Sequence, residues 1–355
     1  MNEFLDQPTA VRPCEELDVE RLQTYLAAHL PEASGPLTVR QFPSGHSNLT
    51  YCLQCGRRQW ILRRPPFGSK VKGAHDMGRE YRILSKLHVV YPPAPEPLWF
   101  CDDPSVTGDR FYLMRRIEGI ILRKDPPAGL EIDAATARRL SQSLVDNLAV
   151  LHGLDYEAAG LGELGKPAGY VTRQVNGWIK RYAGSRTHDI PEVDRVSAWL
   201  VERMPGESGA ALVHNDYKYD NLVLDAGDVT RIVGLLDWEM STLGDPLMDL
   251  ATALAYWVEA DDPPDLQQLR WNPTSLPGSL SRAEIVSRYA AQTGRDASNI
   301  VYHYVFALFK VGVIVQQIYY RYHHGLTSDA RFAPLIDVAR RLFRASLRAM
   351  ERDQI

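Results

Sequence analysis

The polar residues best suited to chemistry lie in one short segment, residues 214–221. The segment has the sequence His-Asn-Asp-Tyr-Lys-Tyr-Asp-Asn and is flanked by the apolar runs 211–213 and 222–224. Loops held between buried strands are common positions for catalytic groups, because the strands provide a rigid support. A second acid, Asp237, ends another apolar run sixteen residues after Asn221. We therefore expect these polar residues to act together.

Asp216, Asn221 and Asp237 can supply one general base and two oxygen ligands for a metal ion. Mg²⁺ accepts few protein ligands and keeps its other positions for phosphate and water. The spacing HxDxxxxN, formed by His214, Asp216 and Asn221 and followed by a further Asp, also matches the catalytic loop of kinases. This combination favours phosphoryl transfer.

The elements that must position these residues form a β-rich first third. Short runs of β-branched, aromatic and aliphatic residues, separated by turn-forming residues, predict an antiparallel sheet. Leucines and aromatic residues at helical spacing predict one amphipathic helix between its strands. The strands are expected at 37–42, 49–55, 59–63, 99–101 and 111–114, and the helix at 74–88.

Beyond Gly119 helical patterns dominate, and a small β-rich island interrupts them. A leucine stripe predicts a helix over 135–152. Strands are expected at 211–213, 222–224 and 231–236, and further helices at 299–323 and 331–350. The pattern predicts an α+β fold in which a small sheet-plus-helix lobe precedes a larger, mostly helical lobe.

The composition excludes several classes of protein. The 355 residues are 45% hydrophobic and 24% charged, which is typical of an ordinary globular chain. The net charge is -4, so the chain lacks the overall positive charge typical of nucleic-acid-binding proteins, and we expect no nucleic-acid partner. Polar residues such as Lys310 interrupt the apolar stretch 301–320, so we expect no membrane span. The N-terminus lacks a basic region followed by an apolar one, which predicts a cytoplasmic location.

The four cysteines do not indicate a metal or disulfide framework. Cys52 and Cys55 form a CxxC, but Cys14 and Cys101 are isolated, so the second pair of a structural zinc site is missing. We interpret Cys52 and Cys55 as strand residues. Nothing in the sequence indicates an oligomeric state.

A set of ordered motifs resembles the aminoglycoside phosphotransferase family of small-molecule kinases. The resemblance runs from about Gln41 to Ala251. The motifs that carry it are His214-x-Asp216, Asn221, Asp237-Trp238-Glu239, Gly244-Asp245-Pro246 and Asp249-Leu250-Ala251. The strings at 45–51, 62–66, 79–82 and 169–171 are most similar to the branch related to the kinase-like domain fused to some acyl-CoA dehydrogenases.

The resemblance implies a bilobal protein-kinase-like fold. It predicts an N-terminal helical extension over 1–30 and a nucleotide-binding N-lobe over 31–116. The C-lobe, over 117–355, would carry the catalytic loop and the helices that bind the substrate.

The resemblance also implies roles for the loop residues. Asp216 would accept or orient the proton of the substrate hydroxyl, while Asn221 and Asp237 would hold Mg²⁺. His214 is expected to brace the loop, and Asp245 and Asp249 to cap or brace backbone N–H groups. Whether Glu239 is a second metal ligand is left open.

The cofactors implied are Mg²⁺ and ATP or GTP. The residues expected to cover the nucleotide phosphates are Ser44, Gly45, Ser47 and Asn48. The connector residues expected to read the base are Met114, Arg116 and Ile117. The loop has a single glycine and so departs from GxGxxG.

Arg63 stands where kinases have a lysine, and Glu80 is its expected partner. A guanidinium binds phosphate bidentately and is always charged, so nucleotide binding is expected to survive. Lys218 is predicted to approach the transferring phosphoryl group, where a fixed cation stabilises the developing negative charge.

The charge of two segments bears on the phosphate acceptor, a small molecule with a hydroxyl group. Segment 166–190 is basic and contains Tyr170, Trp178 and Tyr182, which favours an anionic or acyl-bearing acceptor resembling a hydroxyacyl-CoA. The alternative interpretation of this segment is a solvated basic helix face. An acidic stretch over 259–265 keeps a cationic acceptor, including an aminoglycoside, open. An alternative to a kinase is a regulatory module that binds nucleotide without turnover. The support for this alternative is Arg63, which replaces the usual lysine.

Overall fold

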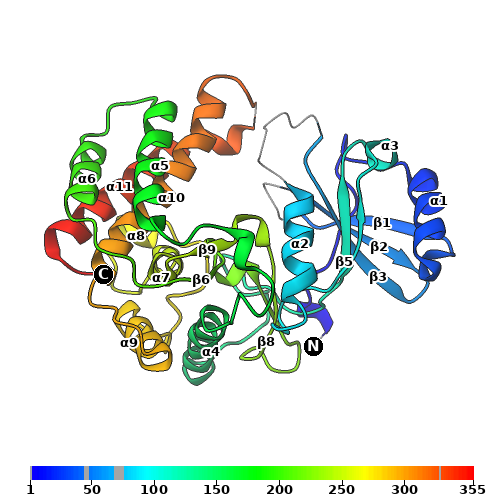
Figure 1. Cartoon of the computed structure of the whole chain (residues 1–355), viewed down its shortest axis with the longest axis horizontal. Coiled ribbons are helices and arrows are strands. Elements are labelled where there is room, and N and C mark those ends of the chain that lie inside the picture. Colours follow the sequence, from blue (N-terminus) through cyan, green and yellow to red (C-terminus); the bar gives the residue numbers. More distant parts are fainter. Residues whose placement is uncertain (1, 44–47, 68–75, 328) are drawn as a thin grey trace. The chain divides into compact units, whose positions relative to one another are not determined.

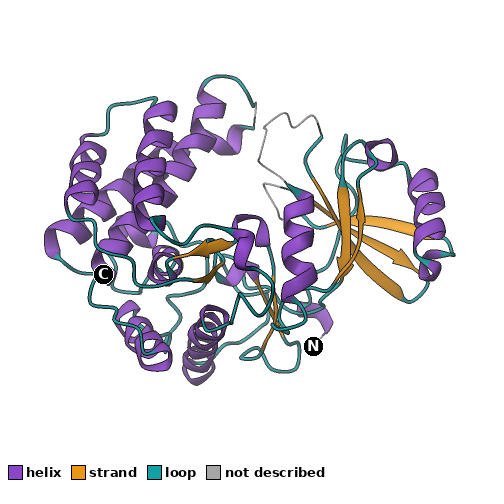
Figure 2. Cartoon of the chain, viewed as in Figure 1, coloured by secondary structure: helices purple, strands orange, loops and turns teal. Residues whose placement is uncertain are grey.

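The computed structural model describes residues 2–43, 48–67, 76–327 and 329–355. The chain forms two compact units (Figures 1 and 2). We call residues 1–121 with 222–239 the sheet unit, and residues 122–221 with 240–355 the helical unit. The α+β class is confirmed.

The sheet unit contains a five-stranded antiparallel sheet. Its strand order is β1-β2-β3-β5-β4. The strands are β1 (Leu37–Gln41), β2 (Leu49–Cys55), β3 (Arg58–Arg64), β4 (Pro97–Cys101) and β5 (Phe111–Arg115). All five predicted strands are confirmed to within two residues at each end, because their apolar runs and turn residues are both local signals.

The alternation of side chains along the strands gives the sheet two different faces. Tyr51, Leu62 and Leu113 lie directly opposite one another and pack against α1 (Val19–His29) in a buried core. One residue further along, Thr50, Arg63 and Tyr112 share the other face. Helix α2 (Met77–Leu87) covers that second face, as Figure 1 shows. The sheet therefore presents Arg63 away from its main core.

Two further short elements complete the sheet unit. A single helical turn, α3 (Pro104–Thr107), lies between β4 and β5. The hairpin of β7 (Leu222–Leu224) and β8 (Ile232–Leu235) joins the unit through a bridge between Ile120 and Leu224. The predicted division had assigned this hairpin to the C-lobe; the predicted lobe boundaries themselves stay a prediction.

The helical unit carries most of the remaining chain. Helices expected at 135–152, 299–323 and 331–350 are confirmed as α4, α10 and α11 to within about one turn. The full set is α4 (Ala134–His152), α5 (Tyr170–Ser185), α6 (Pro191–Glu202), α7 (Pro246–Ala255), α8 (Pro264–Gln267), α9 (Arg282–Thr293), α10 (Ile300–His323) and α11 (Leu335–Arg352). Strands β6 (Ala211–Val213) and β9 (Thr242–Gly244) pair antiparallel within this unit.

Helix α10 is the central element of the helical unit. It packs against α11, α7, α5 and α6. By length and composition it is apolar enough to cross a membrane, contrary to the expectation from its interrupting polar residues. Its most apolar window is 78% buried inside the structure, as in the core helix of a globular unit.

The close approach of α10 and α11 gives a stability test at Gly312. A Cβ at Gly312 would lie 2.6 Å from the Phe343 ring, whereas a Cβ at Gly184 in α5 would meet no heavy atom within 4 Å. Overpacking costs about 1–3 kcal/mol, so Gly312→Ala should lower the free energy of unfolding despite alanine's better helix propensity. Gly184→Ala is the matched control and should cause no loss. Urea unfolding measures both, and equal stability of the two variants would contradict the packing argument.

Candidate active site

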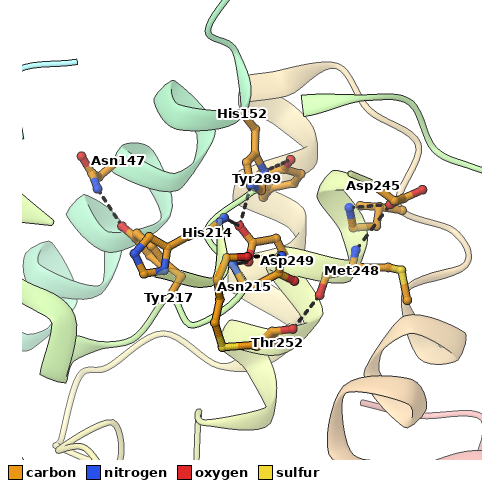
Figure 3. A network of polar contacts seen from close by, with 12 residues as sticks. Asn147, His152, His214, Asn215, Tyr217, Asp245, Met248, Asp249, Thr252 and Tyr289 are labelled. Atoms are coloured by element: carbon orange, nitrogen blue, oxygen red, sulfur yellow. Dashed lines mark hydrogen bonds and ion pairs between the residues drawn. The ribbon is translucent and has the colours of Figure 1, made fainter. Parts of the chain in front are cut away.

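A buried carboxylate, Asp249 in α7, holds the start of the 214–221 loop. Its two oxygens accept the backbone N–H groups of His214 and Asn215, each at 2.7 Å (Figure 3). His152 Nε2 lies 3.0 Å from the same carboxylate, and the Tyr289 hydroxyl lies 2.7 Å from His152 Nδ1. Burial alone would raise the pKa of Asp249, but the hydrogen bonds from His152 and the loop hold that pKa below its usual value. The predicted bracing role of Asp249 is confirmed.

Asn215 has a left-handed backbone, with φ of 67°. This conformation is uncommon for residues other than glycine, and asparagine tolerates it best. Its side chain is held at both ends: Nδ2 donates to the Met240 carbonyl at 3.2 Å, and Oδ1 accepts from the Tyr170 hydroxyl at 3.2 Å. These contacts fix the direction in which the chain enters Asp216.

The structure brings together Asp216, Lys218 and Asn221, as the sequence predicts. The Lys218 ammonium donates to both carboxylate oxygens of Asp216, at 2.9 and 2.7 Å. The Asn221 amide donates to the Asp216 carbonyl at 2.8 Å and to its Oδ2 at 3.0 Å. The Asp216 side chain is 17% exposed, so it is held firmly and still reaches the surface of the unit.

Tyr256, directly after α7, is a neighbour of this group that sequence reasoning missed. Its ring centroid lies 4.7 Å from the Lys218 ammonium. Burial disfavours the Lys218 ammonium, but Tyr256 and Asp216 outweigh burial and raise the pKa of Lys218. Lys218 is therefore a cation at neutral pH. Tyr256 had no local signal, because it ends an apolar run like any core aromatic residue.

The remaining loop residues are structural supports. The His214 ring is fully buried and meets the Tyr217 ring edge-on, with centroids 6.3 Å apart. The Tyr217 hydroxyl donates to the Leu144 carbonyl at 2.8 Å, which ties the loop to α4. Asp245 caps α7 by accepting the Leu247 N–H at 2.8 Å, so its predicted capping role is confirmed.

The sheet unit contains the second acid, Asp237, which follows β8 with a left-handed φ of 69°. Arg63 donates to Asp237 Oδ1 at 2.8 Å, and its Nε lies 3.5 Å from Glu80 Oε2. Glu80 in turn accepts the Trp238 N–H at 3.1 Å. The expected Arg63–Glu80 pair is confirmed.

Electrostatics keep Arg63 charged in this buried position. Its side chain is 8% exposed and that of Glu80 is 1% exposed. Burial disfavours the guanidinium, but Glu80 and Asp237 outweigh it and raise the pKa of Arg63. Burial raises the pKa of Glu80, and the Arg63 charge opposes that shift. Arg63 and Glu80 are buried, and the side chain of Asp237, at 30% exposure, completes the cluster beside β8.

Of the predicted phosphate-covering residues, Ser44, Gly45 and Ser47 lie outside the described residues. Asn48 is buried, and its amide donates to Glu239 Oε2 at 2.6 Å. The Glu239 carbonyl also accepts from the Arg79 guanidinium at 3.1 Å. Glu239 thus links the end of the loop to the segment after Asp237. Its role as a metal ligand stays open.

The predicted connector residues lie at the end of β5 and directly after it. Their role in reading the base stays a prediction. Met114 belongs to β5 and pairs with Ile61. The Arg116 guanidinium donates to the Asp6 carbonyl at 2.9 Å, and Ile117 lies beside Gly234. The contact of Arg116 with the N-terminal segment indicates a packing function for its side chain.

Asn221 and Asp237 carry oxygen donors of the kind that Mg²⁺ prefers. The Asn221 amide nitrogen points to Asp216, which leaves the amide oxygen on the opposite side for a cation. The described part of the chain holds no group of three or more His, Cys, Asp or Glu able to bind a metal alone. Mg²⁺ needs only one or two such oxygens when phosphates supply others. Asn221 in the helical unit and Asp237 in the sheet unit each carry an oxygen donor of the kind that this ion accepts.

Comparisons with known proteins define the class of this fold. The fold is kinase-like: it matches choline kinase from Cryptosporidium parvum with a TM-score of 0.64 at 12% identity, over 94% of this chain and 96% of that one. It also matches the crystal structure of a candidate aminoglycoside phosphotransferase from Ralstonia eutropha, with a TM-score of 0.80 and 29% identity, over 95% of this chain and 99% of that one.

The sequence comparisons identify the family. Residues 38–277 match the phosphotransferase enzyme family, so the chain belongs to that family. It is also 35% identical over 329 residues to acyl-CoA dehydrogenase family member 11 of Rattus norvegicus. That alignment covers 90% of this chain and 41% of the rat protein, so the chain spans less than half the length of this relative.

The Asp249 network predicts a pH-dependent loss of stability in Asp249→Asn. An amide would direct N–H groups at the backbone donors, and we expect a loss of about 3 kcal/mol in the free energy of unfolding at pH 7. Because the folded pKa of Asp249 is lowered, its contribution is present above the unfolded value of about 3.9 and disappears as pH falls through the folded value.

Thermal and urea unfolding from pH 7 down to pH 3 provide the measurement. The difference between wild type and Asp249→Asn should be largest at pH 7 and should shrink below about pH 4. Asp189→Asn, which removes an exposed partner of Arg186, should stay within about 0.5 kcal/mol of wild type. A pH-independent difference would refute the assignment.

Proposed function

We propose that this protein is an ATP-dependent kinase of a small molecule that carries a hydroxyl group. The observation that carries the proposal is the Asp216 carboxylate, held by Lys218 and Asn221 in a loop that Asp249 braces. Asp216 takes the proton of the acceptor hydroxyl while the oxygen of that hydroxyl bonds to the γ-phosphorus. The bond from that phosphorus to the β–γ bridging oxygen breaks, and ADP leaves.

The other predicted residues are proposed to stabilise the negative charge of the nucleotide phosphates. We propose Asn221 and Asp237 each as a ligand of Mg²⁺, which would neutralise phosphate charge when bound. Arg63 is a buried, permanently charged group that suits phosphate binding in place of the usual lysine. Lys218 lies 2.7 Å from Asp216 Oδ2, so an acceptor bound at Asp216 would bring the transferring phosphoryl group near its ammonium.

Turnover is favoured over a regulatory module that only binds nucleotide. A binding module needs no proton acceptor next to the loop, yet Asp216 is ion-paired, oriented and partly exposed. Arg63, the support for the regulatory alternative, keeps both its acidic partners. Mg²⁺-dependent ATP binding without any ADP formation, across a broad panel of acceptors, would favour the regulatory reading.

The acidic stretch over 259–265 gives little support to a cationic acceptor. Asp262 is buried in an ion pair with Arg282, and Glu259 lies 3.4 Å from the same guanidinium. Asp265 pairs with Arg348 at 2.8 Å. These carboxylates are already neutralised within the unit, which weakens the aminoglycoside alternative.

Two cations of the basic segment are better placed for an anionic acceptor. Arg173 caps the preceding loop by donating to backbone carbonyls, and Arg186 pairs with Asp189. Arg181 instead lies over the Trp178 ring, 4.6 Å from its centroid, and Lys180 is exposed. In the part of the chain that the structure describes, neither Lys180 nor Arg181 forms an ion pair. We propose that they attract an anionic portion of the acceptor.

The name of the rat relative supports an acyl thioester as that acceptor. It is called an acyl-CoA dehydrogenase family member, and this chain matches 41% of it. A hydroxyacyl-CoA combines a hydroxyl for phosphorylation with phosphate groups that Lys180 and Arg181 can attract. We therefore propose a hydroxyacyl-CoA-like acceptor.

The role of Asp216 predicts a selective loss of turnover in Asp216→Asn. We expect kcat to fall by about 10²–10⁴, because general-base catalysis contributes that factor. Mg²⁺·ATP affinity, measured by calorimetry, should change little. Asp225→Asn, in the turn of the β7–β8 hairpin, is the control and should keep wild-type kcat. A kcat within about twofold of wild type would exclude Asp216 as the base.

The acceptor class can be tested by coupled ADP release. Hydroxyacyl-CoA thioesters should be turned over faster than kanamycin-like compounds. Arg181→Gln should raise the KM for the thioester about tenfold, a change of ~1.4 kcal/mol, and leave kcat nearly unchanged. Arg340→Gln, which removes a surface pair with Asp337, is the matched control. Preferred turnover of kanamycin would overturn the acceptor assignment.

A further inference from the structure

Lys310 is a buried cation in the middle of α10, and its hydrogen-bond partners are all neutral groups. It is 2% exposed. Its ammonium donates to the Asn215 carbonyl at 3.1 Å, to Asn215 Oδ1 at 3.3 Å and to the Thr252 hydroxyl at 3.5 Å. In the described parts of the chain no carboxylate is recorded within ion-pair distance of this ammonium. Its three partners are a backbone carbonyl, an amide and a hydroxyl.

Burial of this ammonium works against folding. Removal of a charge from water is costly unless an opposite charge compensates for it. Burial lowers the pKa of Lys310 to about 8, although the carboxylates of Asp249 and Asp216 oppose the shift. The adjacent positions Phe309 and Val311 are apolar core residues, as α10 requires. Stability of the core therefore does not account for a lysine at position 310.

The contacts that Lys310 makes with the 214–221 loop explain why a lysine is present at this position. The Asn215 carbonyl belongs to the peptide bond that joins Asn215 to Asp216. Asp249 holds the N–H side of Asn215, and Lys310 holds its carbonyl side and its side-chain oxygen. The left-handed residue before Asp216 is thus fixed from two helices, α7 and α10.

We infer that Lys310 is a positioning residue for phosphoryl transfer, whose ammonium fixes the Asn215–Asp216 peptide and thereby aims the Asp216 carboxylate. This inference deepens the proposed function and rests on Asp216 as the base. Lys310 is almost completely buried and donates to Asn215, so its action on the reaction would pass through Asn215. The loss of its ammonium should therefore affect kcat rather than substrate binding.

The test compares Lys310→Met, which keeps the volume and removes the charge, with Lys124→Met at an exposed position of the same unit. Lys310→Met should lower kcat at least about 30-fold while both KM values stay within about threefold. Its melting temperature should stay near that of wild type, because relief of the buried charge offsets the lost hydrogen bonds. Lys124→Met should match wild type in every measurement.

The pH profile separates this role from simple packing. The charged groups that act on Lys310 are Asp249 in α7, Asp216 and Lys218 in the loop, and Arg181 in α5. In wild type, kcat should decline as pH rises through about 8, because the neutral amine is a weaker donor. That decline should be absent from Lys310→Met.

Two outcomes of the kinetic experiment would overturn the inference. The first is a kcat for Lys310→Met within about twofold of wild type. The second is a loss of kcat matched by a large fall in melting temperature and in nucleotide affinity, which indicates general destabilisation.

Amide hydrogen exchange keeps this test independent of the proposed reaction. Lys310→Met should speed exchange in peptide 214–221 and leave the flanking turns of α10 unchanged. If wild type turns over no acceptor, the proposed function fails, yet the exchange result still decides whether Lys310 holds the loop. Unchanged exchange in peptide 214–221 would reject the positioning role.

Discussion

One buried carboxylate, Asp249, sets the geometry on which the helical unit's site depends. Two backbone N–H groups at the start of the loop would be buried without partners if the carboxylate were absent, and such groups are costly. An ionised carboxylate at zero exposure must itself be compensated, and His152 with Tyr289 provides that compensation. The loop, α4, α7 and α9 are therefore coupled through one charge.

The sheet unit also contains a buried charge that is compensated by its neighbours, but there the charge is positive. Arg63 is a buried cation on the second face of the sheet, and it is compensated by Glu80 and Asp237. Glu80 extends the arrangement by accepting the Trp238 N–H, so a helix residue orients the backbone after β8. In both units a buried charge orients a loop, because directional hydrogen bonds to charged groups are stronger than those between neutral ones.

Local patterns in the sequence predicted most strands and the long helices. The HxDxxxxN spacing singled out Asp216 and Asn221, and the position of Lys218 two residues after Asp216 singled out that lysine. What escaped prediction depends on partners distant in sequence. Lys310 was interpreted only as an interruption of an apolar run, since its partner Asn215 lies 95 positions earlier. The acids over 259–265 suggested an acidic surface, although Arg282 pairs with Glu259 and Asp262, and Arg348 pairs with Asp265. Side-chain periodicity carries no information about such pairings.

Two residues of the candidate site with left-handed backbone, Asn215 and Asp237, explain the positions of the charged groups around them. Asn215 and Asp237 have φ of 67° and 69°, a conformation that costs of order 1 kcal/mol or more in a residue other than glycine. Such backbone persists only where its surroundings over-determine it. Asp249 and Lys310 surround Asn215, and Arg63 holds Asp237. The charges of Asp249, Lys310 and Arg63 therefore stabilise two strained backbone positions, one directly before Asp216 and one at Asp237 itself.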